Sequence, residues 1–85
     1  MQERTVRVRT GKDFGLALAE ARAAKGLTQR EVAESSGIDR TYLARLESGQ
    51  SVIQLERALL VLRRLGAEVI VSIPADPAGA SSRAE

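Results

Sequence analysis

Three polar residues, Arg40, Thr41 and Arg45, recur at a spacing that would place them on one side of a single helix. Arg45 follows Thr41 by four residues and Arg40 by five, so the three side chains would share one outward sector. Arginine can bond guanine through two parallel hydrogen bonds, which is the commonest specific contact in the DNA major groove. The spacing therefore predicts a helix that contacts base edges, with Arg40 either at a base or at a phosphate.

The surrounding segment, Leu27–Gly49, carries the signals of two short helices joined by a turn. A capping box predicts the first helix over residues 29–35, and a capping aspartate predicts the second over residues 40–47. The alternative is an ordinary helical hairpin that binds no ligand. The signals are the capping pair Thr28 and Glu31, the inward Val32 and Ala33, the turn residue Gly37, the apolar Ile38, the cap Asp39, and the inward Leu43 and Leu46.

Four further elements should hold this segment in place. We expect a half-buried strand over residues 5–10, a helix capped by Asp13 that runs to Lys25, a helix over 54–65, and a strand over 67–73. The residues expected to face inward are Val6, Val8, Phe14, Leu18, Ala21, either Leu16 or Ala17, Leu55, Ala58, Leu59, Leu62, Leu65, Val69, Val71 and Ile73.

The domain organisation follows from these elements and from composition. Residues 1–10 form an arm or strand, residues 11–73 form one helical domain, and residues 74–85 are small and polar enough to be a disordered tail. Gly11 and Gly15 have the spacing of a GxxxG motif, but their charged context favours chance over close helix packing.

Composition argues against an enzyme. The 85 residues contain no histidine and no cysteine, which removes the usual general base, the commonest metal ligands and any disulfide. We therefore expect no catalytic residue, cofactor or metal. Eleven arginines against two lysines suit phosphates and guanine, although a GC-rich genome would give the same bias. No signal peptide or membrane span is visible, so we expect a cytoplasmic, nucleoid-associated protein without membrane contact.

Residues 26–66 resemble the XRE-type helix-turn-helix family, which includes the Cro and C1-type phage repressors. The sequence departs from the family pattern before the last helix, where Ile53-Gln54 replaces Pro-Ser. The matching residues are Leu27-Thr28-Gln29, Glu31-Val32-Ala33, Gly37-Ile38, Leu43, Leu46-Glu47, Gly49, Leu55 and Leu65-Gly66.

The resemblance implies a mostly α fold, a four-helix lambda repressor-like domain, and a role for each matching residue. Gln29 would bind a phosphate and brace the recognition helix, and Arg22 would form a partly buried salt bridge with Glu47. The alternative for that pair is two independent surface charges. Base edges would be read by Arg40, Thr41, Ala44 and Arg45, while Asp39, Tyr42 and Ser48 would lie near the DNA backbone.

The strand that follows the four helices narrows the resemblance to HipB-like antitoxins. A lone strand leaves its backbone groups unpaired, so it needs the N-terminal strand, its counterpart in a second copy, or both. We expect the strand that carries Val69, Val71 and Ile73 to pair with its counterpart across a homodimer. The strand that carries Val6 and Val8 is a candidate outer strand on each side. The resemblance implies a repressor of its own operon that binds palindromic operator DNA and a HipA-like Ser/Thr kinase toxin. The alternatives are a stand-alone XRE regulator and an adaptor that no longer binds DNA.

Overall fold

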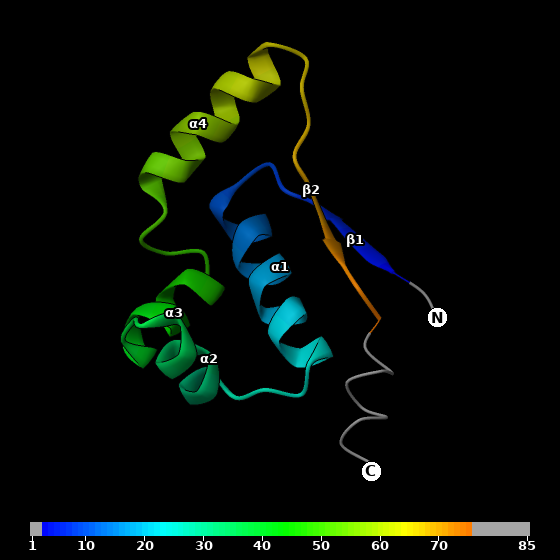
Figure 1. The fold of residues 1–85 in the computed structure, drawn as a ribbon. Coiled ribbons are helices and arrows are strands. Elements are labelled where there is room, and N and C mark those ends of the chain that lie inside the picture. The colour runs from blue at the N-terminus through cyan, green and yellow to red at the C-terminus, as the bar shows by residue number, and fades with distance from the viewer. Residues whose placement is uncertain (1–2, 76–85) are drawn as a thin grey trace.

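Four helices and two strands make up residues 3–75, the part of the chain that this computed structural model describes (Figure 1). The predicted disordered tail lies outside the described residues except for Pro74 and Ala75, which belong to no helix or strand. The elements follow in the order β1 (Arg4–Arg7), α1 (Gly11–Ala24), α2 (Gln29–Ser36), α3 (Arg40–Glu47), α4 (Ile53–Arg64) and β2 (Ile70–Ile73).

The start of α1 differs from the prediction, because Thr10 rather than Asp13 is the N-cap. The Thr10 hydroxyl accepts a hydrogen bond from the Asp13 N–H at 3.1 Å. The Asp13 carboxylate in turn accepts from the N–H groups of Arg9 and Thr10. The backbone N–H of Arg9 is the main reason that the pKa of Asp13 lies below its ordinary value. Asp13 is therefore the third residue of a capping box and lies inside the helix.

The GxxxG spacing of Gly11 and Gly15, which the sequence analysis attributed to chance, is a site of close packing. A Cβ on Gly15 would lie 2.5 Å from the Glu47 carbonyl oxygen and 2.6 Å from that of Leu46, so α1 touches the end of α3 at this position. A Cβ on Gly11 would clash with a methyl group of Val52, just before α4. Two small residues one turn apart let α1 contact both neighbours, even though the context is charged.

The two strands form an antiparallel pair in which Val6 lies opposite Val71. The N-terminal strand is thus the partner of the C-terminal strand within the chain, which is one of the alternatives that the sequence left open. Both strands are shorter than predicted. The segment before β2 begins by completing the end of α4, where the N–H of Ala67 donates to the Leu62 carbonyl at 2.9 Å. The pairing continues past the strands, because the Val8 N–H donates to the Val69 carbonyl at 2.8 Å.

The sheet covers α1 with its apolar face and closes the core. Ala17, not Leu16, is the inward residue of the predicted pair, since Leu16 is 48% exposed. An ion pair between Arg4 and Glu20 joins β1 to α1 at the rim. The buried cluster is Val6, Val8, Ala17, Leu59 and Ile73, with Phe14, Ala21, Ala24, Leu55, Val69 and Val71 packed against it.

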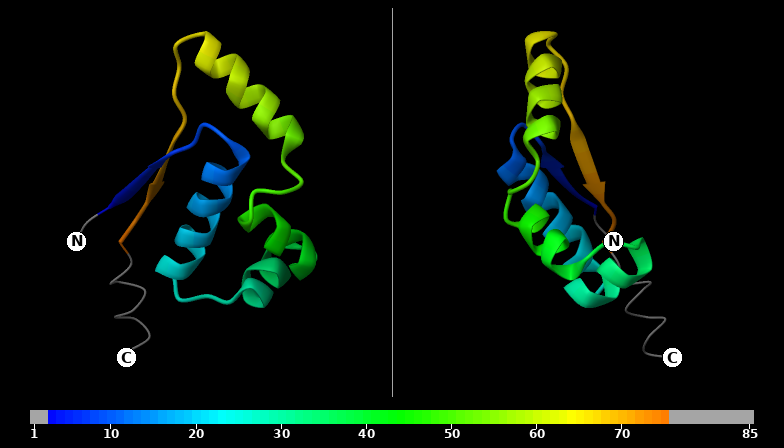
Figure 2. Two further views of the ribbon diagram at one scale, coloured as in Figure 1. Left: turned by 180° about the vertical axis from the view of Figure 1, so that it is seen from behind. Right: turned by 90° about the vertical axis from the view of Figure 1, so that its left-hand side faces the viewer.

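Helix α4 contacts the other elements along a narrow side only and projects away from α2 and α3 (Figures 1 and 2). Leu59 is buried as predicted, but Ala58 is exposed and Leu65 is 75% exposed, so their predicted inward positions are wrong. The apolar stripe is wider than the strip that α1 and the sheet can cover. The large apolar residues left exposed on and just after α4 are Ile53, Leu60, Val61 and Leu65, which we call the α4 face.

Candidate nucleic-acid interface

The predicted helix-turn-helix segment forms α2 and α3, and its local signals act as expected. Thr28 and Glu31 make the capping box of α2, with hydrogen bonds of 3.0 and 2.8 Å between side chain and backbone. Gly37 ends α2 in the left-handed conformation with φ of 72°, which favours glycine. The Asp39 carboxylate caps α3 by accepting from the Thr41 N–H at 3.0 Å.

Helix α3 divides into a buried and an exposed side. Leu43 is 2% exposed and anchors the helix on the core, while Ala44, Leu46 and Glu47 are half-buried. Arg40, Thr41 and Arg45 are exposed, as the spacing predicted. The outer side of α3 therefore presents two guanidinium groups and a hydroxyl on a helix that its inner side holds in position.

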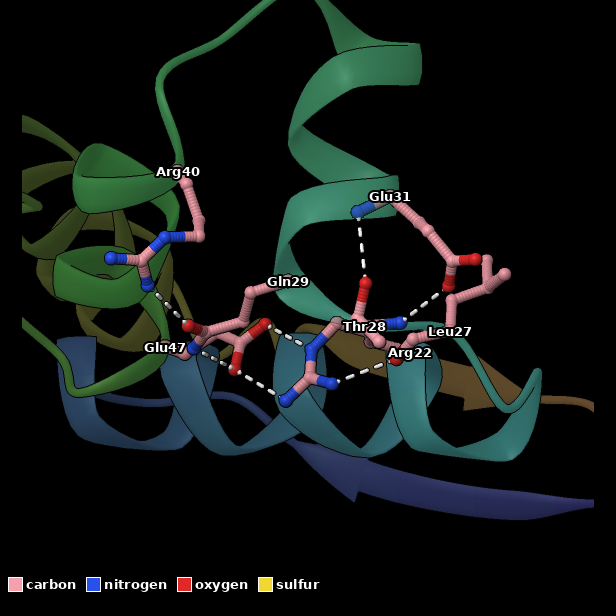
Figure 3. Close-up of polar contacts among 7 residues, drawn as sticks. All are labelled: Arg22, Leu27, Thr28, Gln29, Glu31, Arg40 and Glu47. Atoms are coloured by element: carbon pink, nitrogen blue, oxygen red, sulfur yellow. Dashed lines mark hydrogen bonds and ion pairs between the residues drawn. The ribbon is translucent and has the colours of Figure 1, made fainter.

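Arg22 and Glu47 form the predicted salt bridge between α1 and the end of α3. Arg22 donates through Nε and Nη2 to the two carboxylate oxygens of Glu47, at 2.7 and 3.0 Å, and through Nη1 to the Leu27 carbonyl at 2.8 Å (Figure 3). The Glu47 side chain is 7% exposed and that of Arg22 is 22% exposed, so the alternative of two independent surface charges is wrong. The bonds from Arg22 hold the pKa of Glu47 below its ordinary value, against burial, and a bond from Gln29 adds to this lowering.

Gln29 extends this bridge to the outer side of α3. Its amide Nε2 donates to Glu47 at 3.1 Å, and its Oε1 accepts a hydrogen bond from Nη1 of Arg40 at 3.3 Å (Figure 3). The carboxylate of Glu47 can only accept, so it fixes which end of the amide faces Arg40. A continuous polar chain thus runs from Arg22 through Glu47 and Gln29 to the first residue of α3. The bridge between Arg22 and Glu47 and a bracing role for Gln29 were predicted from the sequence, but the hydrogen bond between Gln29 and Arg40 was not.

A broad, open hollow of about 850 Å³ lies at the start of α2. Three arginines line it, Arg22, Arg30 and Arg40, together with Gln29 and one acidic residue, Glu31. Sequence reasoning missed Arg30, although its place in the first turn of α2, directly after Gln29, was a usable signal. A net positive set of side chains at the start of a helix suits a phosphate group.

The other predicted site residues lie around α3. Tyr42 is 44% exposed, and Asp39 and Ser48 are exposed at the two ends of the helix. Ser48 donates its hydroxyl to the Arg45 carbonyl at 3.0 Å. Val69, Val71 and Ile73 are not gathered at this site. They face α1 on the inner side of the sheet, where Ile73 is 3% exposed.

A model of the helix-turn-helix family matches residues 18–69, more than half of the chain. The chain belongs to the helix-turn-helix family. This is a family of DNA-binding regulators rather than enzymes, so the DNA-binding prediction is confirmed at that level. The match begins within α1 and includes all of α2, α3 and α4, so it covers the whole polar chain from Arg22 to Arg40.

This helix-turn-helix protein is also similar to the uncharacterized HTH-type transcriptional regulator y4mF of Sinorhizobium fredii. The two are 29% identical over 70 residues, which cover 82% of this chain and 92% of the relative. No solved structure matches the chain. None of the helices within residues 3–75 is long and apolar enough to cross a membrane.

Proposed function

We propose that this protein is a sequence-specific transcriptional repressor that inserts α3 into the major groove of a palindromic double-stranded operator. The exposed side of α3 carries the proposal, because it combines Arg40, Thr41 and Arg45 with an anchored inner side. The proposed roles assign base edges to Arg40, Thr41, Ala44 and Arg45, the DNA backbone to Asp39, Tyr42 and Ser48, and a phosphate to Gln29.

Replacing Arg45 with alanine tests the proposed base contact. We expect a loss of about 1–3 kcal/mol in operator binding and a relaxed preference at one base pair. The measurement is a gel-shift titration against a selected operator and a scrambled duplex. Gln29→Ala should weaken binding to both duplexes, and Arg64→Ala, on the last turn of α4, controls for the lost charge. Equal losses on both duplexes for Arg45→Ala would reduce Arg45 to a phosphate contact.

The proposed repressor is a homodimer in which β2 pairs with its counterpart. The Val8–Val69 hydrogen bond sets the alternation of the ladder, so the backbone of Val71 points toward β1. The N–H and C=O groups of Ile70 and Ser72 then point to the opposite edge of β2, which pairs with no strand within residues 3–75. Symmetric pairing along this edge would give a four-stranded sheet with β1 of each copy outermost.

Ser72 allows a test that leaves the core untouched, because its side chain is exposed. Ser72→Pro removes one donor from the free edge of β2 and should convert the dimer to a monomer in analytical ultracentrifugation. Ser72→Ala is the matched control, since it removes the hydroxyl that bonds Glu3 but keeps the donor. A tight dimer of Ser72→Pro would mean that the copies associate elsewhere, and the α4 face is then the leading candidate.

The finer proposal is a HipB-like antitoxin that represses its own operon, acts on nucleoid DNA and holds a HipA-like Ser/Thr kinase inactive. Its support is the resemblance of a four-helix core followed by a strand with a free edge. Co-expression with a HipA-like kinase should give one complex that still binds the operator. Separate elution of the two proteins would favour the alternative, a stand-alone regulator. The name of the y4mF relative, which mentions transcriptional regulation alone, agrees with that alternative.

A further inference from the structure

An apolar groove of about 280 Å³ lies between the C-terminal half of α1, the start of α2 and the end of β2. Ile73 and Pro74 line one side of it, and no residue of β1 does. Because β1 occupies one edge of β2, the groove opens beside the other, free edge. The rest of its lining is mostly apolar and comes from Leu18, Ala21, Ala24, Leu27 and Val32, with Arg22 and Lys25 also bordering it.

We infer that this groove receives the β2 strand of a second copy of this chain, so that α1 forms part of the dimer interface. This inference rests on the proposed pairing of β2 along its free edge. A strand paired there would lie about 4.8 Å from β2, on the side where the groove opens. The partner strand would therefore extend over the α1 side chains whatever its exact register.

The chemistry of β2 matches the groove. Side chains alternate along a strand, and in a symmetric pair the inward residues of both strands share one face. Val71 and Ile73 in β2, and Val69 just before it, point inward and are all apolar, and the two valines remain only half-buried within one chain. The partner copy would thus place valine or isoleucine over Leu18 and Ala21. An apolar strand on an apolar groove removes both surfaces from water.

A thiol placed in the groove tests this directly, because the chain contains no cysteine of its own. Leu18→Cys puts one thiol in the groove, and Leu16→Cys puts one on the opposite side of α1, where Leu16 lines no part of it. The measurement is the rate of thiol labelling at protein concentrations above and below the dissociation constant of the dimer. We expect labelling of Leu18→Cys to slow at least about tenfold in the dimer, while Leu16→Cys changes little.

Leu18→Gln supplies a second test that does not depend on labelling. A polar amide in the groove should weaken dimerisation about tenfold or more, whereas Leu16→Gln should leave it unchanged. Circular dichroism and melting of each variant verify that the monomer folds. A wild-type dimer that Ser72→Pro dissociates, but in which Leu18→Cys labels freely, would overturn this inference and leave the strand pairing standing. A wild-type chain that is monomeric throughout would overturn both.

Discussion

Glu47→Gln should cost this protein about 2 kcal/mol of stability at neutral pH. The carboxylate is 7% exposed and accepts two hydrogen bonds from Arg22 and one from Gln29. Removing one partner of a buried ion pair costs about 3–5 kcal/mol, because it leaves the other charge uncompensated. Here water reaches the partly exposed Arg22, and the glutamine keeps one acceptor oxygen. We therefore expect a loss of about 2 kcal/mol, below the range for a fully buried pair. In a domain of this size it corresponds to a fall in Tm of about 8–16 °C.

The effect should also depend on pH in a definite direction. The pKa of Glu47 is lower in the folded chain than its ordinary value of 4.5, so its ionised form stabilises the fold. That contribution is complete above pH 4.5 and is lost as the pH falls through the lowered pKa. Glutamine does not titrate in this range, so the stability gap between the wild type and Glu47→Gln should narrow in acid.

Urea denaturation from neutral pH down to about pH 3 measures both quantities. Glu34→Gln is the matched control, because Glu34 is exposed on α2 and should change stability by less than about 0.5 kcal/mol. A double-mutant cycle with Arg22→Met should give a coupling energy above about 1 kcal/mol. A loss no larger than that of Glu34→Gln, or a gap that does not change with pH, would refute the account of this bridge.

Two further predictions concern local packing and capping. Gly15→Ala should cost about 1–3 kcal/mol, because its Cβ would meet rigid backbone oxygens of α3. Gly37→Ala should cost only about 1 kcal/mol, since its φ is strained but the space around it is open. A smaller loss for Gly15→Ala than for Gly37→Ala in thermal unfolding would contradict the close approach of Gly15 to α3. Thr10→Ala should cost about 1 kcal/mol through the lost cap of α1, and an unchanged Tm would return the capping role to Asp13.

Local signals predicted the helix-turn-helix unit well because each acts within a few residues. The capping box at Thr28, the left-handed Gly37 and the cap Asp39 fixed the bounds of α2 and α3 to within one residue. The same kind of reasoning misplaced the start of α1, where Thr10 and Asp13 are both good capping residues and only the backbone geometry separates them.

The errors that remain arise from contacts between distant segments. Nothing in the local pattern shows that Gly11 and Gly15 face Val52 and Glu47, which lie more than thirty residues away along the chain. The apolar stripe of α4 likewise shows how wide its apolar surface is, but not how much of that surface the rest of the chain covers. For this reason Leu65 was predicted to face inward, although it is exposed. The bond from Arg40 to Gln29 depends on the angle between two helices, and no spacing encodes that angle.

The pairing of β1 with β2 joins Arg7 to Ile70, more than sixty residues apart along the chain, and this has consequences for how the protein is made. Contacts within α2 and α3 are local and form quickly, whereas the sheet must wait for a large loop to close. At ordinary translation rates β2 is synthesised roughly 3–13 s after β1. During that interval Val6 in β1 and Val8 just after it have no partner strand beside them, and the nascent chain carries an unpaired strand prone to aggregation. β2 is therefore the last element needed to complete the core, and α2 and α3 have had time to form before it is made.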